Sequence, residues 1–162
     1  MSTTTQTQFK RDILQDETSA EVTALLQDNL TNLIDLALLM KQAHWNVVGP
    51  NFRSIHLQLD EIIDSVRAGS DEVAERIVTL GIPADGRVST VAADSKVEGY
   101  PDGFVKVSET ISRVADALKQ VIESLRSAIE RLGDLDAISE DMLIAISGEL
   151  EKHLWMLQAQ EV

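Results

Sequence analysis

Apolar side chains recur every three or four residues along most of the chain, which is the period of a helix buried on one face. Four such runs can be separated, and the strict apolar–polar alternation of a strand is almost absent. They cover about residues 18–48, 51–80, 107–132 and 137–159. This pattern predicts an all-α protein built as a four-helix bundle.

Capping and turn residues indicate where these helices begin and end. Thr18 and Glu21 have the spacing of a capping box at the start of the first helix. Asn51 can cap the second helix, and Gly133 follows the third. Gly69 lies inside the second helix, where glycine costs ~1 kcal/mol relative to alanine. We therefore expect another helix to cross closely at Gly69.

The segments outside the helices define the domain organisation. Residues 1–16 are polar, rich in Thr and Gln, and are expected to form a flexible tail before a single bundle domain at 17–162. Residues 82–105 are too many for a hairpin turn. A connection of this length lets the chain cross the end of a bundle, and it has room for a short helix.

Composition narrows the class of protein. The chain has 162 residues, no cysteine and a formal net charge of −13. The absence of cysteine excludes disulfides and thiolate metal sites and suits the cytoplasm. No apolar run approaches the ~18 residues that span a membrane, so no membrane association is expected. The acidic balance disfavours the phosphate backbone of DNA and attracts cations.

Candidate metal ligands concentrate between residues 44 and 76. His56 and Asp60 form one pair at helical i, i+4 spacing, and Asp71 and Glu75 form another. His44 precedes them across a Gly-Pro break. The pairs share one face of the second helix but lie roughly 16 Å apart along its axis, whereas a metal–ligand bond is ~2 Å. One straight helix cannot bring both pairs to one metal.

Two interpretations of these pairs remain. Each pair works separately or not at all, or a neighbouring subunit packs its second helix antiparallel about a two-fold axis near Val66 and completes two identical sites. Iron sites within one bundle use Glu-x-x-His pairs, which are absent here. The residues three positions before the three histidines are Lys41, Arg53 and Leu150. Two histidines and three carboxylates suit iron, so a site shared between subunits is favoured.

These residues also resemble a known family. The chain reads KQAHWNV at 41–47, carries His56 and Asp60, and continues with DEVAER at 71–76 and KHLWM at 152–156. In these motifs and over nearly its whole length it resembles the Dps proteins, the starvation-induced mini-ferritins of the ferritin-like superfamily.

The resemblance implies a ferritin-like bundle that assembles as a hollow homo-dodecamer with ferroxidase centres at its two-fold interfaces. It implies oxidation of Fe(II), preferably by hydrogen peroxide, storage of Fe(III) mineral and protection against oxidative damage. His44, His56 and Asp60 would be ligands from one subunit, and Asp71 and Glu75 would come from its partner.

Other residues near these motifs have less certain roles. Trp45 is either a packing residue or a group that absorbs a stray oxidising equivalent during catalysis. Trp155 is expected in the core, although the resemblance allows it a redox role like that considered for Trp45, and His153 is expected in a structural or interface position. Arg76 is a candidate to pair with a carboxylate at the interface.

Two sets of acidic residues are candidates for iron transport and mineral formation. One set lies where the last helix begins, a position that lines three-fold pores in the Dps family. The other could nucleate mineral if it faces the cavity, although a solvated surface is an equal alternative. The pore set is Asp134, Asp136, Glu140 and Asp141, and the nucleation set is Glu61 and Asp64.

Two alternative functions follow from the same residues. A metal held by histidines and carboxylates can activate water and hydrolyse an amide or ester, but the sequence shows no dedicated base. A DNA-compacting role is disfavoured because the N-terminal tail offers only Lys10 and Arg11 as basic residues. DNA binding is therefore expected to be weak or absent.

Overall fold

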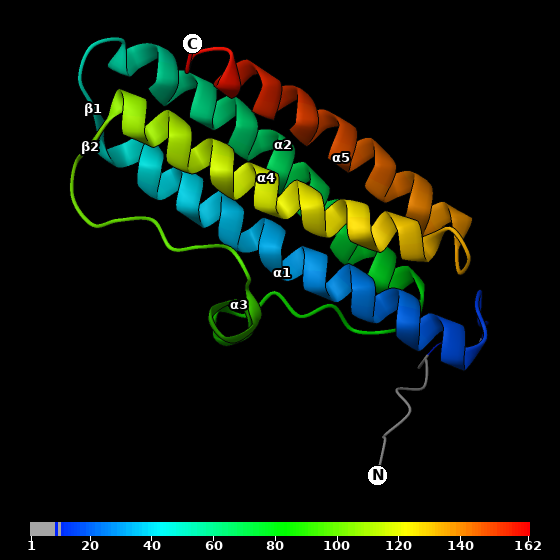
Figure 1. Cartoon of the computed structure of the whole chain (residues 1–162). Coiled ribbons are helices and arrows are strands. Elements are labelled where there is room, and N and C mark those ends of the chain that lie inside the picture. The colour runs from blue at the N-terminus through cyan, green and yellow to red at the C-terminus, as the bar shows by residue number, and fades with distance from the viewer. Residues whose placement is uncertain (1–8, 10) are drawn as a thin grey trace.

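The protein is a four-helix bundle with a lengthwise crossover (Figure 1). This computed structural model describes residue 9 and residues 11–162, so most of the expected tail at 1–16 lies outside the described residues. The bundle helices run close to the predicted ranges, and the crossover contains the short helix for which it has room. In chain order the elements are α1 Asp16–Asn46, β1 Val47–Val48, α2 Phe52–Thr79, α3 Val88–Asp94, β2 Val105–Lys106, α4 Val107–Leu132 and α5 Ala137–Gln158.

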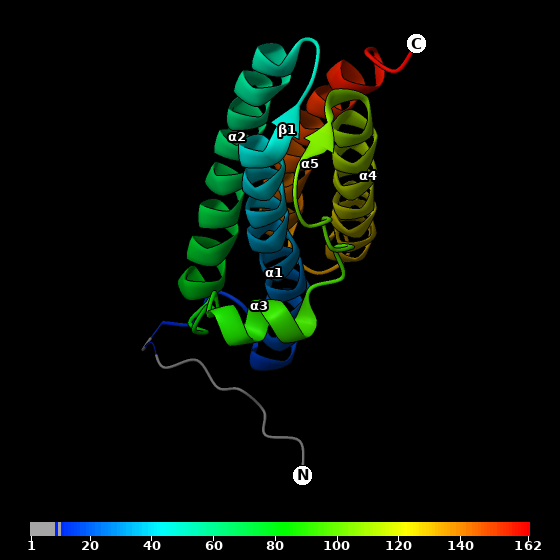
Figure 2. The same cartoon turned by 90° about the vertical axis from the view of Figure 1, so that its left-hand side faces the viewer.

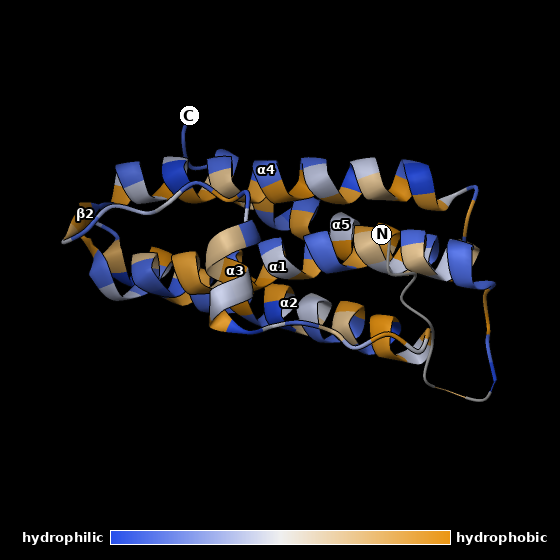
Figure 3. Cartoon of the chain, turned by 90° about the horizontal axis from the view of Figure 1, so that it is seen from below, coloured by the Kyte–Doolittle hydropathy of each residue, from blue (hydrophilic) through white to orange (hydrophobic). Residues whose placement is uncertain are grey.

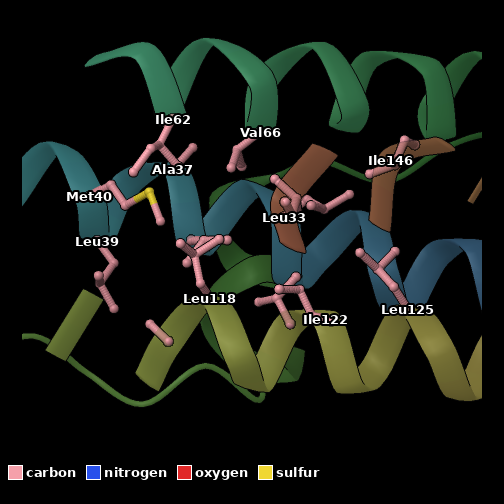
Figure 4. Close-up of a cluster of buried hydrophobic side chains, with 14 of the residues drawn as sticks. Leu33, Ala37, Leu39, Met40, Ile62, Val66, Leu118, Ile122, Leu125 and Ile146 are labelled. Carbon is pink, nitrogen blue, oxygen red and sulfur yellow. The ribbon is translucent and has the colours of Figure 1, made fainter. Parts of the chain in front are cut away.

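The hydrophobic core runs the length of the bundle between the four long helices. Leu33 and Met40 of α1, Ile62 of α2 and Leu118 and Leu125 of α4 are all fully buried. Figure 4 shows these side chains converging on the bundle axis. Figure 3 shows apolar residues concentrated on the inner faces and polar residues outside. The three-to-four spacing of the sequence is thus the physical cause of the bundle.

The pairing of the helices determines the path of the long connection between α2 and α4. α1 and α2 form one antiparallel pair, α4 and α5 form the other, and residues 80–106 connect them (Figure 2). The crossover does not cross one end of the bundle, as the sequence suggested, but returns along α1 for the length of the bundle. It ends where β2 pairs in parallel with β1, with Val105 opposite Val47. This two-residue ladder is too short to leave a periodic signal.

Polar contacts fix the crossover to α1. The Gln27 side chain donates to the main-chain oxygen of Asp85 at 2.8 Å and accepts from its N–H at 2.9 Å. Farther along, the Ser95 hydroxyl donates to Asp35 at 2.5 Å, and the Asn32 side chain accepts from the N–H of Lys96 at 3.0 Å. These bonds satisfy buried polar groups that a long loop would otherwise leave unpaired.

Two of the three expected helix-end signals differ from the structure. α1 begins at Asp16, so Thr18 lies in the first turn and the capping box with Glu21 does not form. Asn51 occupies the residue before α2 but has a left-handed backbone with φ 63° and makes no side-chain cap bond. The stop expected at Gly133 is confirmed, because α4 ends at Leu132, although Gly133 has helical rather than left-handed backbone angles.

The close crossing expected at Gly69 is confirmed. A Cβ atom added at this position would lie 3.0 Å from Cγ2 of Ile146 on α5. Glycine therefore lets α2 and α5 approach each other midway along the bundle. This contact fixes the face of α2 that is left for the carboxylates described below.

Candidate functional site

The two histidines of the predicted site lie face to face where α1 ends and α2 begins. The Nδ1 atom of His44 is 2.7 Å from the main-chain oxygen of His56, and Nδ1 of His56 is 2.9 Å from the main-chain oxygen of His44. Their ring centroids are 3.7 Å apart with an angle of 19° between the planes. The rings are therefore held in place by a reciprocal pair of hydrogen bonds.

This reciprocal pair decides which nitrogen of each ring can bind a metal. A main-chain carbonyl only accepts hydrogen bonds, so each Nδ1 carries the proton and donates it. In a neutral imidazole the other nitrogen, Nε2, then has a free lone pair. Such a second bond orients a histidine ligand and raises its basicity. His44 and His56 therefore each have one ring nitrogen available to bind a metal.

Asp60 places a carboxylate beside the histidine pair, one turn farther along α2. Its Oδ1 atom lies 3.4 Å from Nδ1 of His44 and 2.5 Å from Nζ of Lys41. The hydrogen bond from Lys41 lowers the pKa of Asp60, partial burial opposes this, and the charges of the two histidines and Lys41 add to the lowering. Asp60 is therefore ionised near neutral pH, as a metal ligand must be.

Asp71 and Glu75 do not join this group within the chain. Both are exposed on α2, three turns beyond Asp60. Across residue 9 and residues 11–162, no three histidine or carboxylate side chains come close enough to hold a metal ion together. The same holds for His44, His56 and Asp60 by themselves, and the completion of a site by a second subunit remains a prediction.

Arg76 has its partner inside the chain. Its Nη2 atom lies 2.7 Å from Oδ2 of Asp136, and its Nε donates to the hydroxyl of Ser139 at 3.0 Å. Burial raises the pKa of the Asp136 carboxyl, but the hydrogen bonds from Ser139 and Arg76 outweigh burial and leave this pKa below its ordinary value. The pairing joins the end of α2 to the start of α5, next to Glu75.

The same contact changes the role of one residue in the predicted pore set. Asp136 is buried and caps α5, where its Oδ2 accepts from the N–H of Ser139 at 3.2 Å. Asp136 therefore has a structural role, which its residue type could have indicated because Asp is a preferred cap residue. Asp134 and Asp141 are exposed, and a pore role for them stays a prediction.

The two tryptophans are both on the surface of the chain. Trp45, beside His44, is 67% exposed, and Trp155 is 65% exposed. The expectation that Trp155 lies in the core is wrong, because His153 two residues earlier takes the inward position. Packing inside the bundle does not explain Trp45 either.

His153 ties α5 to α2 away from the histidine pair. It is buried, its Nε2 atom lies 2.9 Å from the hydroxyl of Ser65, and Glu149 is 3.6 Å away. Nδ1 is buried without a hydrogen-bond partner among the described residues. Burial lowers the pKa of His153, the effect of Glu149 and Glu61 being opposite and smaller. These contacts agree with the structural role expected for it.

No helix in the described part of the chain is long and apolar enough to cross a membrane. Residues 23–161 match the family described as the Ferritin-like domain. The fold and this match define the class, a ferritin-like protein. Within that class the chain belongs to the Dps family, as the following relatives show.

Relatives in both sequence and structure carry the family name. The DNA protection during starvation protein of Mycolicibacterium smegmatis is 40% identical over 146 residues, which cover 90% of this chain and 80% of the relative. The corresponding protein of Agrobacterium fabrum is 32% identical over 90% of this chain and 91% of its own length. The Mycobacterium smegmatis Dps structure in its tetragonal form superposes with a TM-score of 0.90 and 40% identity, covering 96% of this chain and 94% of that one.

A further solved structure bears on iron. Dps from Microbacterium arborescens in its high iron form is 33% identical, with a TM-score of 0.87 over 93% of this chain and 98% of that one. Membership of the family supports a general function in iron storage and DNA protection. The ligands and the oxidant of this chain are a separate question.

Proposed function

We propose that this protein is a ferroxidase that oxidises Fe(II), preferably with hydrogen peroxide, and stores the Fe(III) product inside a dodecameric cage in the cytoplasm. The observation that carries the proposal is the reciprocal hydrogen bonding of His44 and His56, which leaves the Nε2 atom of each ring free to bind a metal, while the ionised carboxylate of Asp60 lies 3.4 Å from Nδ1 of His44. Neutral imidazoles and carboxylates are ligands suited to Fe(II).

Each centre is completed by the neighbouring subunit. His44, His56 and Asp60 supply one half, and Asp71 and Glu75 of the partner subunit supply the other. An antiparallel approach of two α2 helices creates two such centres at one two-fold axis. The apolar rings of Trp45 and Phe52 flank the histidine pair and are substantially exposed in the single chain, which supports a subunit contact at this face.

The reaction needs no cofactor besides its substrates. Two Fe(II) ions each give one electron to hydrogen peroxide, the O–O bond breaks, and two protons complete two molecules of water. Carboxylates favour the product because their negative charge stabilises Fe(III) more than Fe(II). Two-electron reduction of peroxide avoids a hydroxyl radical, which is how such a centre protects the cell against oxidative damage.

Trp45 has a protective role in this proposal. Its indole ring adjoins His44 in sequence and is exposed, so it can give up an electron when only one Fe(II) ion reacts. A Trp45→Phe variant keeps an aromatic ring at this exposed position but oxidises less easily. We expect normal iron oxidation with more hydroxyl radical escaping to a spin trap in solution.

The acidic surface serves iron delivery and storage. The chain carries a net charge of −13, which raises the local concentration of cations at clefts and pores. Asp134, Glu140 and Asp141 are the remaining pore candidates. Glu61 and Asp64 are exposed on α2 and are candidates for nucleating mineral.

The test compares the assembled wild-type protein with a His56→Ala/Asp60→Ala variant. After anaerobic loading with Fe(II), peroxide should produce rapid Fe(III) absorbance and a soluble iron core in the wild type. The variant should oxidise iron no faster than free solution, while an Asp116→Ala variant, altered at an exposed carboxylate of α4, stays normal. Equal oxidation by wild type and the double variant, or metal-dependent amide cleavage without oxidation, would reject the proposal.

A further inference from the structure

The group formed by His44, His56 and Asp60 is called the histidine half-site here. Among the described residues, Lys41 is the one lysine or arginine that contacts it. It lies on α1 one helical turn before His44, so both side chains point to the same side of the helix. Its Nζ atom contacts Oδ1 of Asp60 at 2.5 Å. The side chain of Lys41 is 21% exposed and that of Asp60 is 43% exposed, so this ion pair sits at the mouth of the site.

The contact with Lys41 occupies one oxygen of the Asp60 carboxylate. Lys41 and His44 both approach the same oxygen, Oδ1 of Asp60. A metal ion and an ammonium group cannot occupy the same position beside that oxygen. Since an ammonium group has no lone pair, Lys41 cannot act as a ligand while it is charged. It can only compensate the carboxylate or compete with an incoming cation.

We propose that Lys41 is a positioning residue that acts as a tethered cation: it holds Asp60 in place before iron binds, and it weakens the binding of a divalent ion to the centre. This inference rests on the proposed ferroxidase site. It adds a residue that is not a ligand but sets how tightly the ligands hold Fe(II).

The sign and size of the effect follow from charge. An ammonium group within several ångströms of a dication repels it, and removing that repulsion should tighten binding on the order of tenfold. Loss of the hydrogen bond frees Asp60 to move, which works against binding. Solvent screens both effects at this exposure, but a dication is repelled about twice as strongly as a single charge at the same distance, so the repulsion is the larger effect. Weak binding also favours turnover, because Fe(III) must leave the centre for the mineral.

The experiment measures binding of Zn²⁺, which does not undergo oxidation, by calorimetry on the assembled protein near neutral pH. The signal of interest is the part that a His56→Ala variant lacks. Lys41→Met and Lys41→Gln remove the ammonium group, and Lys41→Arg keeps the charge. Lys119→Met is the matched control, because Lys119 is also paired with a carboxylate, Glu123, but lies on the exposed face of α4.

We expect Lys41→Met and Lys41→Gln to bind Zn²⁺ on the order of tenfold more tightly than wild type. Lys41→Arg and Lys119→Met should stay close to wild type. If wild type shows histidine-dependent binding but neither neutral variant tightens it, the inference fails and the proposed site stands. Tightening by Lys41→Arg would also overturn it, because charge would not be the cause. Absence of histidine-dependent binding in every protein would overturn the site and the inference together.

Discussion

The contact between Arg76 and Asp136 is expected to be the most sensitive polar interaction in the bundle. The two side chains are only 12% and 7% exposed. Oδ2 of Asp136 accepts from Arg76 and from both the N–H and the hydroxyl of Ser139. An Asp136→Ala substitution removes all three bonds and leaves a guanidinium group buried without its charge partner.

The magnitude follows from these contacts. Breaking a buried ion pair by removing one partner costs about 3–5 kcal/mol, and loss of a helix N-cap costs ~1 kcal/mol. The two contributions share one oxygen and do not add fully, so we expect Asp136→Ala to lower the free energy of unfolding by about 3–4 kcal/mol. For a chain of this size that shifts the midpoint of thermal unfolding down by about 6–16 °C.

The assay is thermal unfolding followed by circular dichroism at one fixed protein concentration, because subunit assembly makes the midpoint depend on concentration. Asp134→Ala is the control, since Asp134 is an exposed carboxylate two residues away. Replacing both partners by apolar residues, as in Arg76→Met/Asp136→Leu, should recover much of the loss. A midpoint for Asp136→Ala within a degree or two of Asp134→Ala would refute the reasoning.

Three further outcomes are expected. Gly148→Ala, at an open position in α5, should stabilise the protein by about 0.5–1 kcal/mol in chemical denaturation. Gly69→Ala should destabilise it, because the new Cβ atom meets Ile146. Equal effects of the two substitutions would contradict the close crossing of α2 and α5. Burial lowers the pKa of His153, so the unfolded chain binds the proton more readily and the free energy of unfolding should fall as the pH drops below ~6.5. A His153→Gln variant should lose that part of the pH dependence. An unchanged pH profile of stability in this variant would contradict the role of His153. A gel shift at near-neutral pH and ~150 mM salt should show little or no DNA complex, and a clear retarded band would contradict the argument from charge.

The helices were predictable because their apolar period reports directly which face is buried. Gly69 was predictable for a similar reason, since glycine inside a helix needs a packing explanation. The capping box at Thr18 failed because local spacing does not decide which residue starts a helix when flanking residues can also join it. The course of the crossover failed because its polar anchors, such as Gln27 to Asp85, have no periodic signature.

The residue types and spacing predicted the candidate ligands, whose role stays a prediction, but they did not predict the hydrogen bonds that orient the two histidine rings. Spacing places His44 and His56 near each other across a turn, yet it carries no information on hydrogen bonding by Nδ1. The Lys41 contact with Asp60 likewise depends on how α1 and α2 pack. Trp155 was misplaced because an apolar side chain near a core stripe can still point outward.

The central claim is that each iron centre takes its histidines from one subunit and its distal carboxylates from the partner. Two inactive variants test this when they are unfolded together and reassembled, His56→Ala/Asp60→Ala and Asp71→Ala/Glu75→Ala. Each mixed pair of subunits then contains one intact centre and one that keeps only His44 of its five proposed ligands. Random pairing should restore about a quarter of the wild-type rate of Fe(II) oxidation. A mixture as inactive as either parent would contradict a centre shared between subunits.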